Sequence, residues 1–187
     1  MIRCVRPDDA EAIAAIYAPI VERTMISFEE VAPSADEIRA RIAQIAQIWP
    51  WLVFDDGGGA LGYVYGSQHR TRAAYRWSVD VSAYVREDAR GRGLARSLYE
   101  ALFRVLAAQG YHRAYAGIGL PNDASVGLHR ALGFTAVGVY HEVGYKFGAW
   151  HDVSWWERPL GPAGVPLEPI PLADLSADAL DELLRPR

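Results

Sequence analysis

Cysteine, lysine and long apolar runs are all scarce in this chain of 187 residues. Its one cysteine, Cys4, cannot form an internal disulfide, which excludes a disulfide-built secreted scaffold. Charged residues interrupt the N-terminal stretch where a secretory signal needs an apolar core. No apolar run approaches the roughly 18–20 residues needed to span a bilayer. We therefore expect a cytoplasmic protein with no membrane partner.

Excess positive charge is also missing. Lys and Arg number 19 against 23 Asp and Glu, giving a net charge of −4, so we expect no nucleic-acid partner. Apolar residues make up 51 % of the chain and charged residues 22 %, a globular composition with enough side chains for a sizeable core. We expect one domain over residues 1–160. A Pro-rich C-terminal tail follows over 161–187, with a possible short helix at 176–184.

Hydrophobic periodicity predicts a mixed α/β sheet. Helices are expected over 7–23, from the N-cap Ser34 to about Ile48, over 90–109 and over 125–132. Glu37, three residues after Ser34, completes a capping box. Strands are expected over 2–6, 51–54, 61–65, 74–85, 114–118, 134–140 and 153–157. A Gly-rich, aromatic stretch over 141–152 connects the last two strands.

The most informative segment is the Gly-rich turn at 85–95, between a strand and the longest helix. Unpaired N–H groups at a helix N-terminus favour an anion such as a phosphate or pyrophosphate. Gly91 and Gly93 let the backbone approach that ligand, while Arg90 and Arg92 add charge. The turn lacks the Gly-Lys-Ser/Thr of a Walker A motif and the third glycine of a dinucleotide-binding fingerprint.

Two landmarks resemble the GNAT superfamily of N-acetyltransferases. The pattern Arg90-x-x-Gly93-x-Ala95 resembles the superfamily's acyl-CoA pyrophosphate loop, and Asn122, Ser125 and the Leu-Gly-Phe at 132–134 resemble its second landmark. The resemblance implies a central, mostly antiparallel, twisted sheet flanked by helices. That sheet is splayed between strands 4 and 5, and acetyl-CoA is the co-substrate.

Further segments are similar to the phosphinothricin N-acetyltransferase branch. They lie at 49–53, 74–77, 119–126, 129, 144–146 and 150–153, and the match runs from about residue 2 to about 159. Enzymes of this branch acetylate the α-amine of phosphinothricin, methionine sulfoximine or methionine sulfone. The resemblance implies that activity here, by direct transfer with no covalent enzyme intermediate. It also implies a homodimer.

The resemblance implies three catalytic residues. An α-ammonium must lose a proton before it attacks a thioester, and the branch places a Glu for this task where the chain has Asp80. Asp is one methylene shorter, so contact needs a substrate about 1.5 Å closer or a bridging water. Asp80 is therefore the base, part of a proton relay, or only a strand-edge carboxylate. His129 would contact the departing thiolate, or is a polar residue on a half-buried helix. Tyr75 would orient the substrate or assist proton transfer, or is a core aromatic.

The resemblance also assigns binding residues. Those for acetyl-CoA are Tyr84, Val85, Arg90, Gly91, Arg92, Gly93, Leu94, Ala95, Asn122 and Ser125. The substrate's acidic groups favour arginine, with Arg72 the first candidate and Arg70 the second, or these are solvated surface arginines. Phe28 would wall the pocket or pack in the core. Lys146 would cap the pocket, reach a partner subunit or stay solvated.

Two alternatives remain open. The acceptor could be another small amine or a peptide N-terminus, because the change to Asp80 alters the reach of the base. The chain could also be a non-catalytic acyl-CoA-binding sensor, which would bind CoA without turnover. No metal is expected, because the histidines show no metal-ligand spacing and direct acyl transfer needs none.

Overall fold

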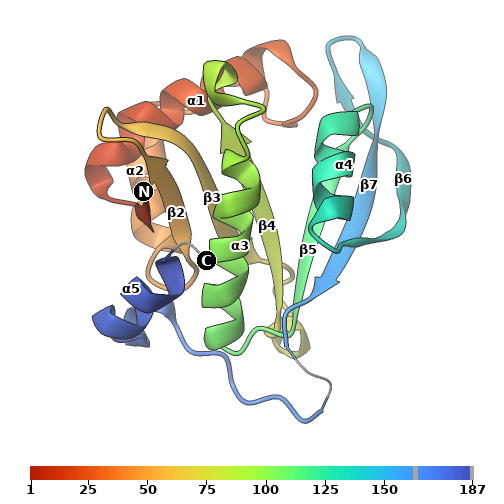
Figure 1. The fold of residues 1–187 in the computed structure, drawn as a ribbon. Helices are drawn as coiled ribbons and strands as arrows, with labels where there is room; N and C mark the ends of the chain where they lie inside the picture. The colour runs from red at the N-terminus through yellow and green to blue at the C-terminus, as the bar shows by residue number, and fades with distance from the viewer. Residues whose placement is uncertain (162–163, 186–187) are drawn as a thin grey trace.

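The computed structural model describes residues 1–161 and 164–185 (Figure 1). Its strands are β1 (Ile2–Cys4), β2 (Trp51–Asp55), β3 (Ala60–Gln68), β4 (Ser78–Val85), β5 (Arg113–Gly119), β6 (Thr135–Lys146) and β7 (Ala149–Pro159). The α-helices are α1 (Ala10–Arg23), α2 (Ala35–Ile45), α3 (Leu94–Ala108), α4 (Asp123–Ala131) and α5 (Ala177–Leu184). Short 3-10 turns are η1 (Pro7–Asp9), η2 (Ala73–Tyr75), η3 (Glu87–Ala89) and η4 (Leu172–Asp174).

The strands form one seven-stranded sheet in the order β1-β2-β3-β4-β5-β7-β6. All neighbouring pairs are antiparallel except β4 and β5, which are parallel. The β4–β5 ladder ends at the pair Asp80–Tyr115, and the two strands then diverge (Figure 1). The predicted mixed sheet with a splay between strands 4 and 5 is confirmed.

Helices cover both faces of the sheet. On β4 the side chains alternate, so Val79 and Val81 pack on Leu98 and Leu102 of α3 in the larger core. On the opposite face, α1 and α2 contribute a second core that includes Ile13, Ile38, Trp51 and Tyr63. Asp80 therefore faces away from α3, toward the side of the sheet that α1 and α2 cover.

Two predicted boundaries of the site region are wrong. The fourth strand begins at Ser78 rather than residue 74, because the N–H of Tyr75 donates to the carbonyl of Arg72 and closes the η2 turn. Helix α3 begins at Leu94 rather than Arg90, because Gly91 and Gly93 have positive φ angles that no α-helix contains.

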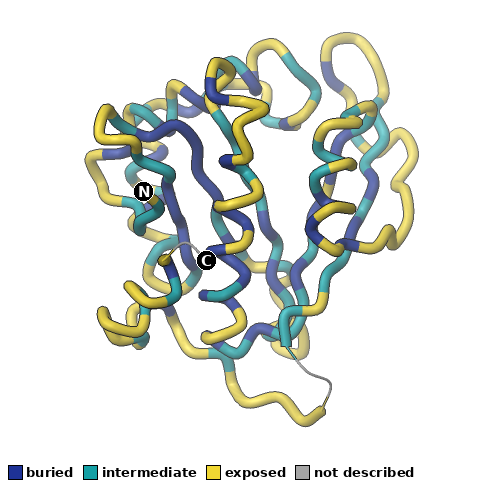
Figure 2. Tube along the Cα trace, in the orientation of Figure 1, coloured by how far each residue is buried: buried dark blue, intermediate teal, exposed yellow. Residues whose placement is uncertain are grey.

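The predicted connection over 141–152 is also wrong, because β6 and β7 continue through it as one long hairpin. Their ladder extends to Lys146–Ala149, after a register shift between Tyr140 and Gly144. Period-two patterning is broken by that bulge, which hides the strand from the sequence pattern. The hairpin places β6 at the edge of the sheet, and Figure 2 shows it as a mostly exposed ribbon.

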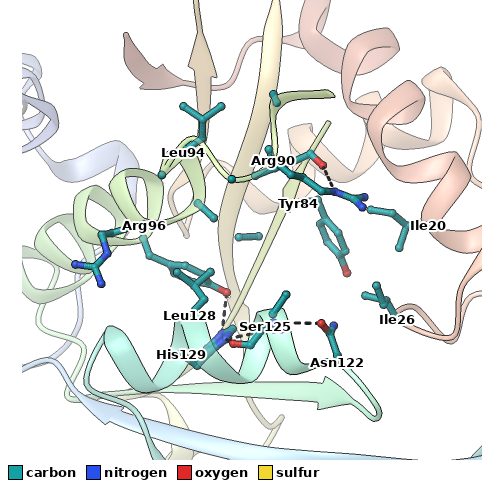
Figure 3. Close-up of a pocket in the computed structure, with 18 residues that line it drawn as sticks. Ile20, Ile26, Tyr84, Arg90, Leu94, Arg96, Asn122, Ser125, Leu128 and His129 are labelled. Carbon is teal, nitrogen blue, oxygen red and sulfur yellow. Dashed lines mark hydrogen bonds between the residues drawn. The ribbon is translucent and has the colours of Figure 1, made fainter. Parts of the chain in front are cut away.

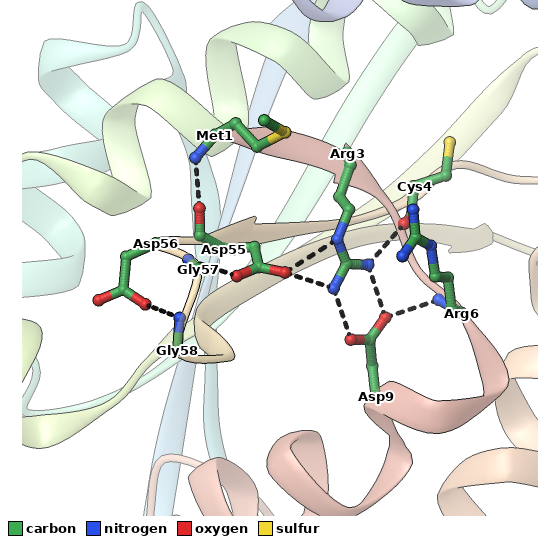
Figure 4. A network of polar contacts seen from close by, with 9 residues as sticks. All are labelled: Met1, Arg3, Cys4, Arg6, Asp9, Asp55, Asp56, Gly57 and Gly58. Carbon is green, nitrogen blue, oxygen red and sulfur yellow. Dashed lines mark hydrogen bonds and ion pairs between the residues drawn. The ribbon is translucent and has the colours of Figure 1, made fainter.

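An ion network fixes the start of the chain to the sheet (Figure 4). The guanidinium of Arg3 in β1 lies 2.8 Å from the carboxylates of both Asp9 and Asp55. Burial raises the pKa of Asp9, but hydrogen bonds from Arg3 and from the N–H of Arg6 outweigh it, so the pKa is lowered overall. The network therefore joins β1, η1 and the end of β2.

The C-terminal segment packs against the sheet and α3. Leu172 and Leu184 are buried in the larger core. The side-chain amide of Gln109 donates to the carbonyls of Ile48 and Ile170, which ties this segment to the residue range between α2 and β2. Within the described residues, no helix has both the length and the apolar character needed to cross a membrane.

Candidate functional site

A cavity of about 480 Å³ opens where β4 and β5 diverge (Figure 3). Its walls come from the end of β4, the loop before α3, the first turns of α3, and α4. A smaller cavity of about 60 Å³ lies deeper, between residues 81–84 of β4 and 116–119 of β5. Tyr84, Tyr99, Asn122, Ser125 and His129 line both cavities, so the two form one path toward the vertex of the splay.

The loop before α3 is shaped to bind an anion. Gly91 and Gly93 have φ angles of 73° and 78°, and no atom lies within 4 Å of where a Cβ would stand. The N–H groups of the first helical turn, beginning at Leu94, have no intrahelical partner. Arg90 and Arg96 also line the cavity and add positive charge. A pyrophosphate fits this cradle on geometry and charge.

The edge of β4 supplies further polar groups to the cavity. Beyond Asp80, the ladder leaves the β5 side of β4 without a strand partner among the described residues. Backbone N–H and C=O groups on such an edge pair readily with an extended amide chain. The pantetheine arm of CoA is such a chain, so the loop before α3 and the edge of β4 fit the pyrophosphate and the pantetheine arm of acetyl-CoA.

The predicted CoA-binding residues come together in the structure, with one exception. All of them except Arg92 line the larger cavity. The sequence pattern missed Arg96 and Tyr99, together with Ile20, Ile26 and Leu128. Most of these belong to helical apolar faces, where lining a cavity and packing in a core give the same pattern.

His129 lies on α4 at the deep end of the path. Its Nδ1 lies 2.8 Å from the carbonyl oxygen of Ser125, and its Nε2 lies 3.2 Å from the hydroxyl of Tyr99. A carbonyl only accepts, so Nδ1 carries the proton and Nε2 accepts from Tyr99. Burial lowers the pKa of His129 and favours this neutral form.

Asp80 and Tyr75 do not line either cavity. Asp80 is hydrogen-bonded to His69, whose Nδ1 lies 2.6 Å from its Oδ1. Burial raises the pKa of Asp80, although the contact with His69 opposes that shift. The ring of Tyr75 lies 6.0 Å from the His69 ring, and 44 % of the residue is exposed. Both predicted residues thus belong to a cluster on the face opposite α3.

The predicted acceptor residues surround that face. Arg70 lies over the ring of Trp155, with 5.7 Å between its Cζ and the ring centroid. Arg72 is exposed at the start of η2. Phe28 extends from the segment after α1 to the hairpin, where a Cβ on Gly144 would stand 2.2 Å from its ring.

Lys146 is buried at the tip of the hairpin. Its ammonium donates to the carbonyls of Val21, Thr24 and Ser27, at 2.7, 3.1 and 2.7 Å. Because all three donors are used, Lys146 joins the hairpin to the segment that follows α1 instead of presenting its charge to a ligand. Burial lowers the pKa of this lysine. Across the described ranges, His, Cys, Asp and Glu form no group that could hold a metal ion.

Comparisons with known proteins agree with this geometry. The acetyltransferase (GNAT) domain family matches residues 2–155. The chain is 42 % identical over 161 residues to a phosphinothricin N-acetyltransferase of Alcaligenes faecalis, covering 85 % of this chain and 82 % of that one. It is 38 % identical to an L-methionine sulfoximine/L-methionine sulfone acetyltransferase of Pseudomonas paraeruginosa, covering 82 % and 91 %.

A solved structure is similar over nearly the whole chain. It is a GNAT superfamily phosphinothricin acetyltransferase from Sinorhizobium meliloti in complex with AcCoA, with a TM-score of 0.86 and 35 % identity. The alignment covers 94 % of this chain and 97 % of that one. The splayed sheet and its anion-binding loop define an acyl-CoA-dependent transferase. The chain belongs to the GNAT acetyltransferase family, and its co-substrate is acetyl-CoA.

Proposed function

We propose that the protein acetylates the α-amine of a small amino acid of the phosphinothricin, methionine sulfoximine and methionine sulfone class. The observation that carries this proposal is the identity of 42 % and 38 % to enzymes named for those substrates, over more than four-fifths of the chain. The acceptor would approach the face of the sheet that carries Asp80, opposite the helices α3 and α4.

In this proposal, the side of the splay that α3 and α4 cover binds acetyl-CoA and stabilises the groups that change charge during the transfer. The loop at 90–95 holds the pyrophosphate, and backbone N–H groups near Tyr84 and Val85 stabilise the tetrahedral oxyanion. His129 and Tyr99 face the thioester sulfur from the α3 and α4 side. The amine attacks the thioester directly, so the chain forms no covalent intermediate.

Charged and aromatic residues would select the acceptor. Arg72 and Arg70 are the candidates for the acidic groups of an amino acid, since guanidinium forks match carboxylate and phosphinate geometry. Phe28 would close one wall, because it already spans from the segment after α1 to the hairpin at Gly144. Tyr75 stands half-exposed beside the His69–Asp80 pair and would orient the substrate.

The test is thiol release from acetyl-CoA with methionine sulfone, methionine sulfoximine and phosphinothricin, beside a panel of ordinary amines and short peptides. Release with the first three compounds alone is the expected result. Release only with other amines would keep the acetyltransferase chemistry and overturn the substrate class. Bound acetyl-CoA with no release on any compound would favour an acyl-CoA sensor.

We also propose that the protein is a cytoplasmic homodimer built through the β6–β7 hairpin, with residues 1–160 as the catalytic domain. Strand β6 is a sheet edge, and edges with apolar side chains tend to pair with another chain. Seven large apolar residues of the hairpin are exposed: Val137, Val139, Tyr140, Val143, Tyr145, Phe147 and Trp150. Acetyl-CoA, the co-substrate, is a cytoplasmic metabolite.

Light scattering after size-exclusion chromatography tests the dimer. Val139→Asp should convert a dimer of the wild-type chain into monomers, because a charge opposes burial at an edge. Val165→Asp is the matched control, since Val165 is 98 % exposed outside the hairpin. A monomeric wild-type chain at micromolar concentration would overturn this part of the proposal.

A further inference from the structure

Asp80 does not stand alone on the acceptor face. In the β3–β4 ladder, Asp80 pairs with Ser67, which brings the end of β3 and the following His69 beside it. Nδ1 of His69 then lies 2.6 Å from Oδ1 of Asp80. An ionised carboxylate only accepts, so Nδ1 carries the proton and Nε2 keeps its lone pair. This is the tautomer that a basic imidazole needs.

Aromatic rings hold the imidazole in one orientation. Its face stacks on Tyr115, with ring centroids 4.3 Å apart and planes 15° apart. Its edges meet Tyr75 and Trp155 at centroid distances of 6.0 and 6.4 Å. The His69 side chain is 11 % exposed. Within residues 1–161 and 164–185, no group forms a hydrogen bond with its Nε2.

The His69–Asp80 pair lies at the vertex of the splay. Asp80 pairs with Tyr115 in the last step of the β4–β5 ladder, and the deeper cavity begins one residue further on each strand. Gly117 lines that cavity, and the Trp155 ring lies 3.4 Å from where a Cβ on Gly117 would stand. The aromatic box around His69 therefore covers the acceptor side of the gap that holds the thioester.

We propose that His69 is the general base of the acetyl transfer, with Asp80 as the positioning residue that orients it. This inference rests on the proposed function. Nε2 of His69 takes one proton from the acceptor's ammonium, and Asp80 stabilises the imidazolium. The freed amine forms the C–N bond with the thioester carbon, and the C–S bond breaks. The second ammonium proton goes to the CoA thiolate, and His69 returns its proton to solvent.

The histidine explains the shorter carboxylate. An aspartate ends one methylene before a glutamate would, and the imidazole fills that distance with a basic nitrogen. Three titratable groups face the imidazole, Asp80 from β4, Tyr115 from β5 and Tyr75 from η2, and the guanidinium of the neighbouring Arg70 donates to the backbone carbonyl of His69. The carboxylate of Asp80 gives the imidazolium that forms during the transfer an oppositely charged partner at hydrogen-bond distance.

A variant series tests the assignment. His69→Phe keeps an aromatic ring in the box but removes both nitrogens, and should lower kcat/KM for the acceptor at least about 100-fold. Adding Asp80→Glu should restore activity to within about tenfold of wild type, because the longer carboxylate reaches the amine. His69→Gln is a second single variant, and an unchanged Kd for acetyl-CoA shows that each variant folds. His112→Phe is the control at an imidazole outside the site.

The pH profile separates a base from a structural ring. In wild type, kcat/KM should fall on the acid side, because a general base must be unprotonated to take the proton of the ammonium. In the double variant this acid limb should move toward the carboxylate range, about 2 pH units lower. An unchanged acid limb, or His69→Phe at full activity, would overturn the proposal while leaving the acetyltransferase function intact.

A measurement without substrate tests the geometry independently. Nitrogen-15 NMR of the wild-type chain should show His69 as the Nδ1–H tautomer, changing when Asp80→Asn removes the carboxylate. An Nε2–H tautomer in wild type would overturn the proposal. Failure of the proposed function looks different: wild type would be inactive on all three amino acids, whatever the tautomer of His69.

Discussion

The hydroxyl of Tyr99 lies 3.2 Å from Nε2 of His129, on the opposite side of the splay from the His69–Asp80 pair. Because Ser125 accepts at Nδ1, the Tyr99 hydroxyl donates to the histidine's free lone pair. The tyrosine is buried, and burial raises its pKa. The site thus holds two polar pairs, and in the proposed mechanism the first contacts the sulfur and the second contacts the amine.

His129→Gln should lower kcat by about 10²- to 10⁴-fold while changing the Kd for acetyl-CoA much less, since the proposed role of the residue is to act on the reacting sulfur. Tyr99→Phe should lower kcat by a similar factor, because the two hydrogen-bonded side chains act as a unit and losing either one removes the function of both. Steady-state kinetics and calorimetric titration measure the two effects. Full kcat in His129→Gln would show that the histidine only packs α4 against α3.

The same histidine makes stability depend on pH. Burial lowers the pKa of His129 in the folded chain, so the unfolded chain binds its proton first as pH falls below about 6.5. The free energy of unfolding should therefore decrease on acidification, until the folded chain also binds the proton. Urea unfolding at pH 7.5 and 5.5 should show a smaller decrease in the free energy of unfolding for His129→Gln than for wild type. Equal decreases in wild type and His129→Gln would contradict the lowered pKa of His129.

Gly93→Val should weaken acetyl-CoA binding so strongly that the Kd rises at least about 100-fold. A branched side chain opposes the φ of 78° and would stand in the anion cradle. Gly57→Val is the matched control, because Gly57 has a φ of 97° in a turn away from the cavity. Both variants should lose stability, but only the first should lose binding. Undiminished binding by Gly93→Val would refute the loop assignment.

Local signals allowed much of the fold to be predicted. The Ser34–Glu37 capping box is present, and the Gly-rich turn lies where the sequence placed it. The long hairpin was missed because its register shift breaks the alternation of apolar residues. Pattern reasoning finds elements when their periodicity is unbroken, and loses them at bulges.

The same limit applies to the candidate site: contiguous residues could be predicted, and contacts between residues distant in the sequence could not. The Gly-rich turn at 85–95 is contiguous, so its pattern could be matched as a unit to the acyl-CoA loop that the family resemblance implies. The partner of Asp80 could not be predicted, because His69 is 11 residues away and reaches it only through the β3–β4 register. The sequence predicts Lys146 as a residue that caps the pocket, reaches a partner subunit or stays solvated, because its carbonyl partners lie more than 100 residues earlier and no local pattern reveals them.

Arg3→Met should destabilise the fold by about 2 kcal/mol, between the values for exposed and buried pairs. The substitution leaves Asp9 without its guanidinium in a site where that side chain is 10 % exposed. The pKa of Asp9 is lowered in the folded chain, so its stabilising effect is present above about pH 4 and is lost as pH falls further. Chemical unfolding at pH 7 and pH 3 should show that Arg3→Met loses less free energy of unfolding on acidification than wild type does. Arg86→Met, which breaks an exposed pair, should change stability less.

Lys146 is the only lysine of the chain, so whole-protein mass reports directly on its accessibility. Acetylation with an N-hydroxysuccinimide ester should add one acetyl group to the native chain, at the N-terminus, and two in urea. The Lys146 ammonium is buried on three carbonyls, and its nitrogen has no lone pair for the reagent while those hydrogen bonds hold it charged. Lys146→Met should leave these carbonyls unsatisfied and destabilise the fold by about 3 kcal/mol. It should also speed hydrogen exchange over residues 24–29, which include Phe28. Rapid native labelling of Lys146 would show that the ammonium faces solvent or ligand instead.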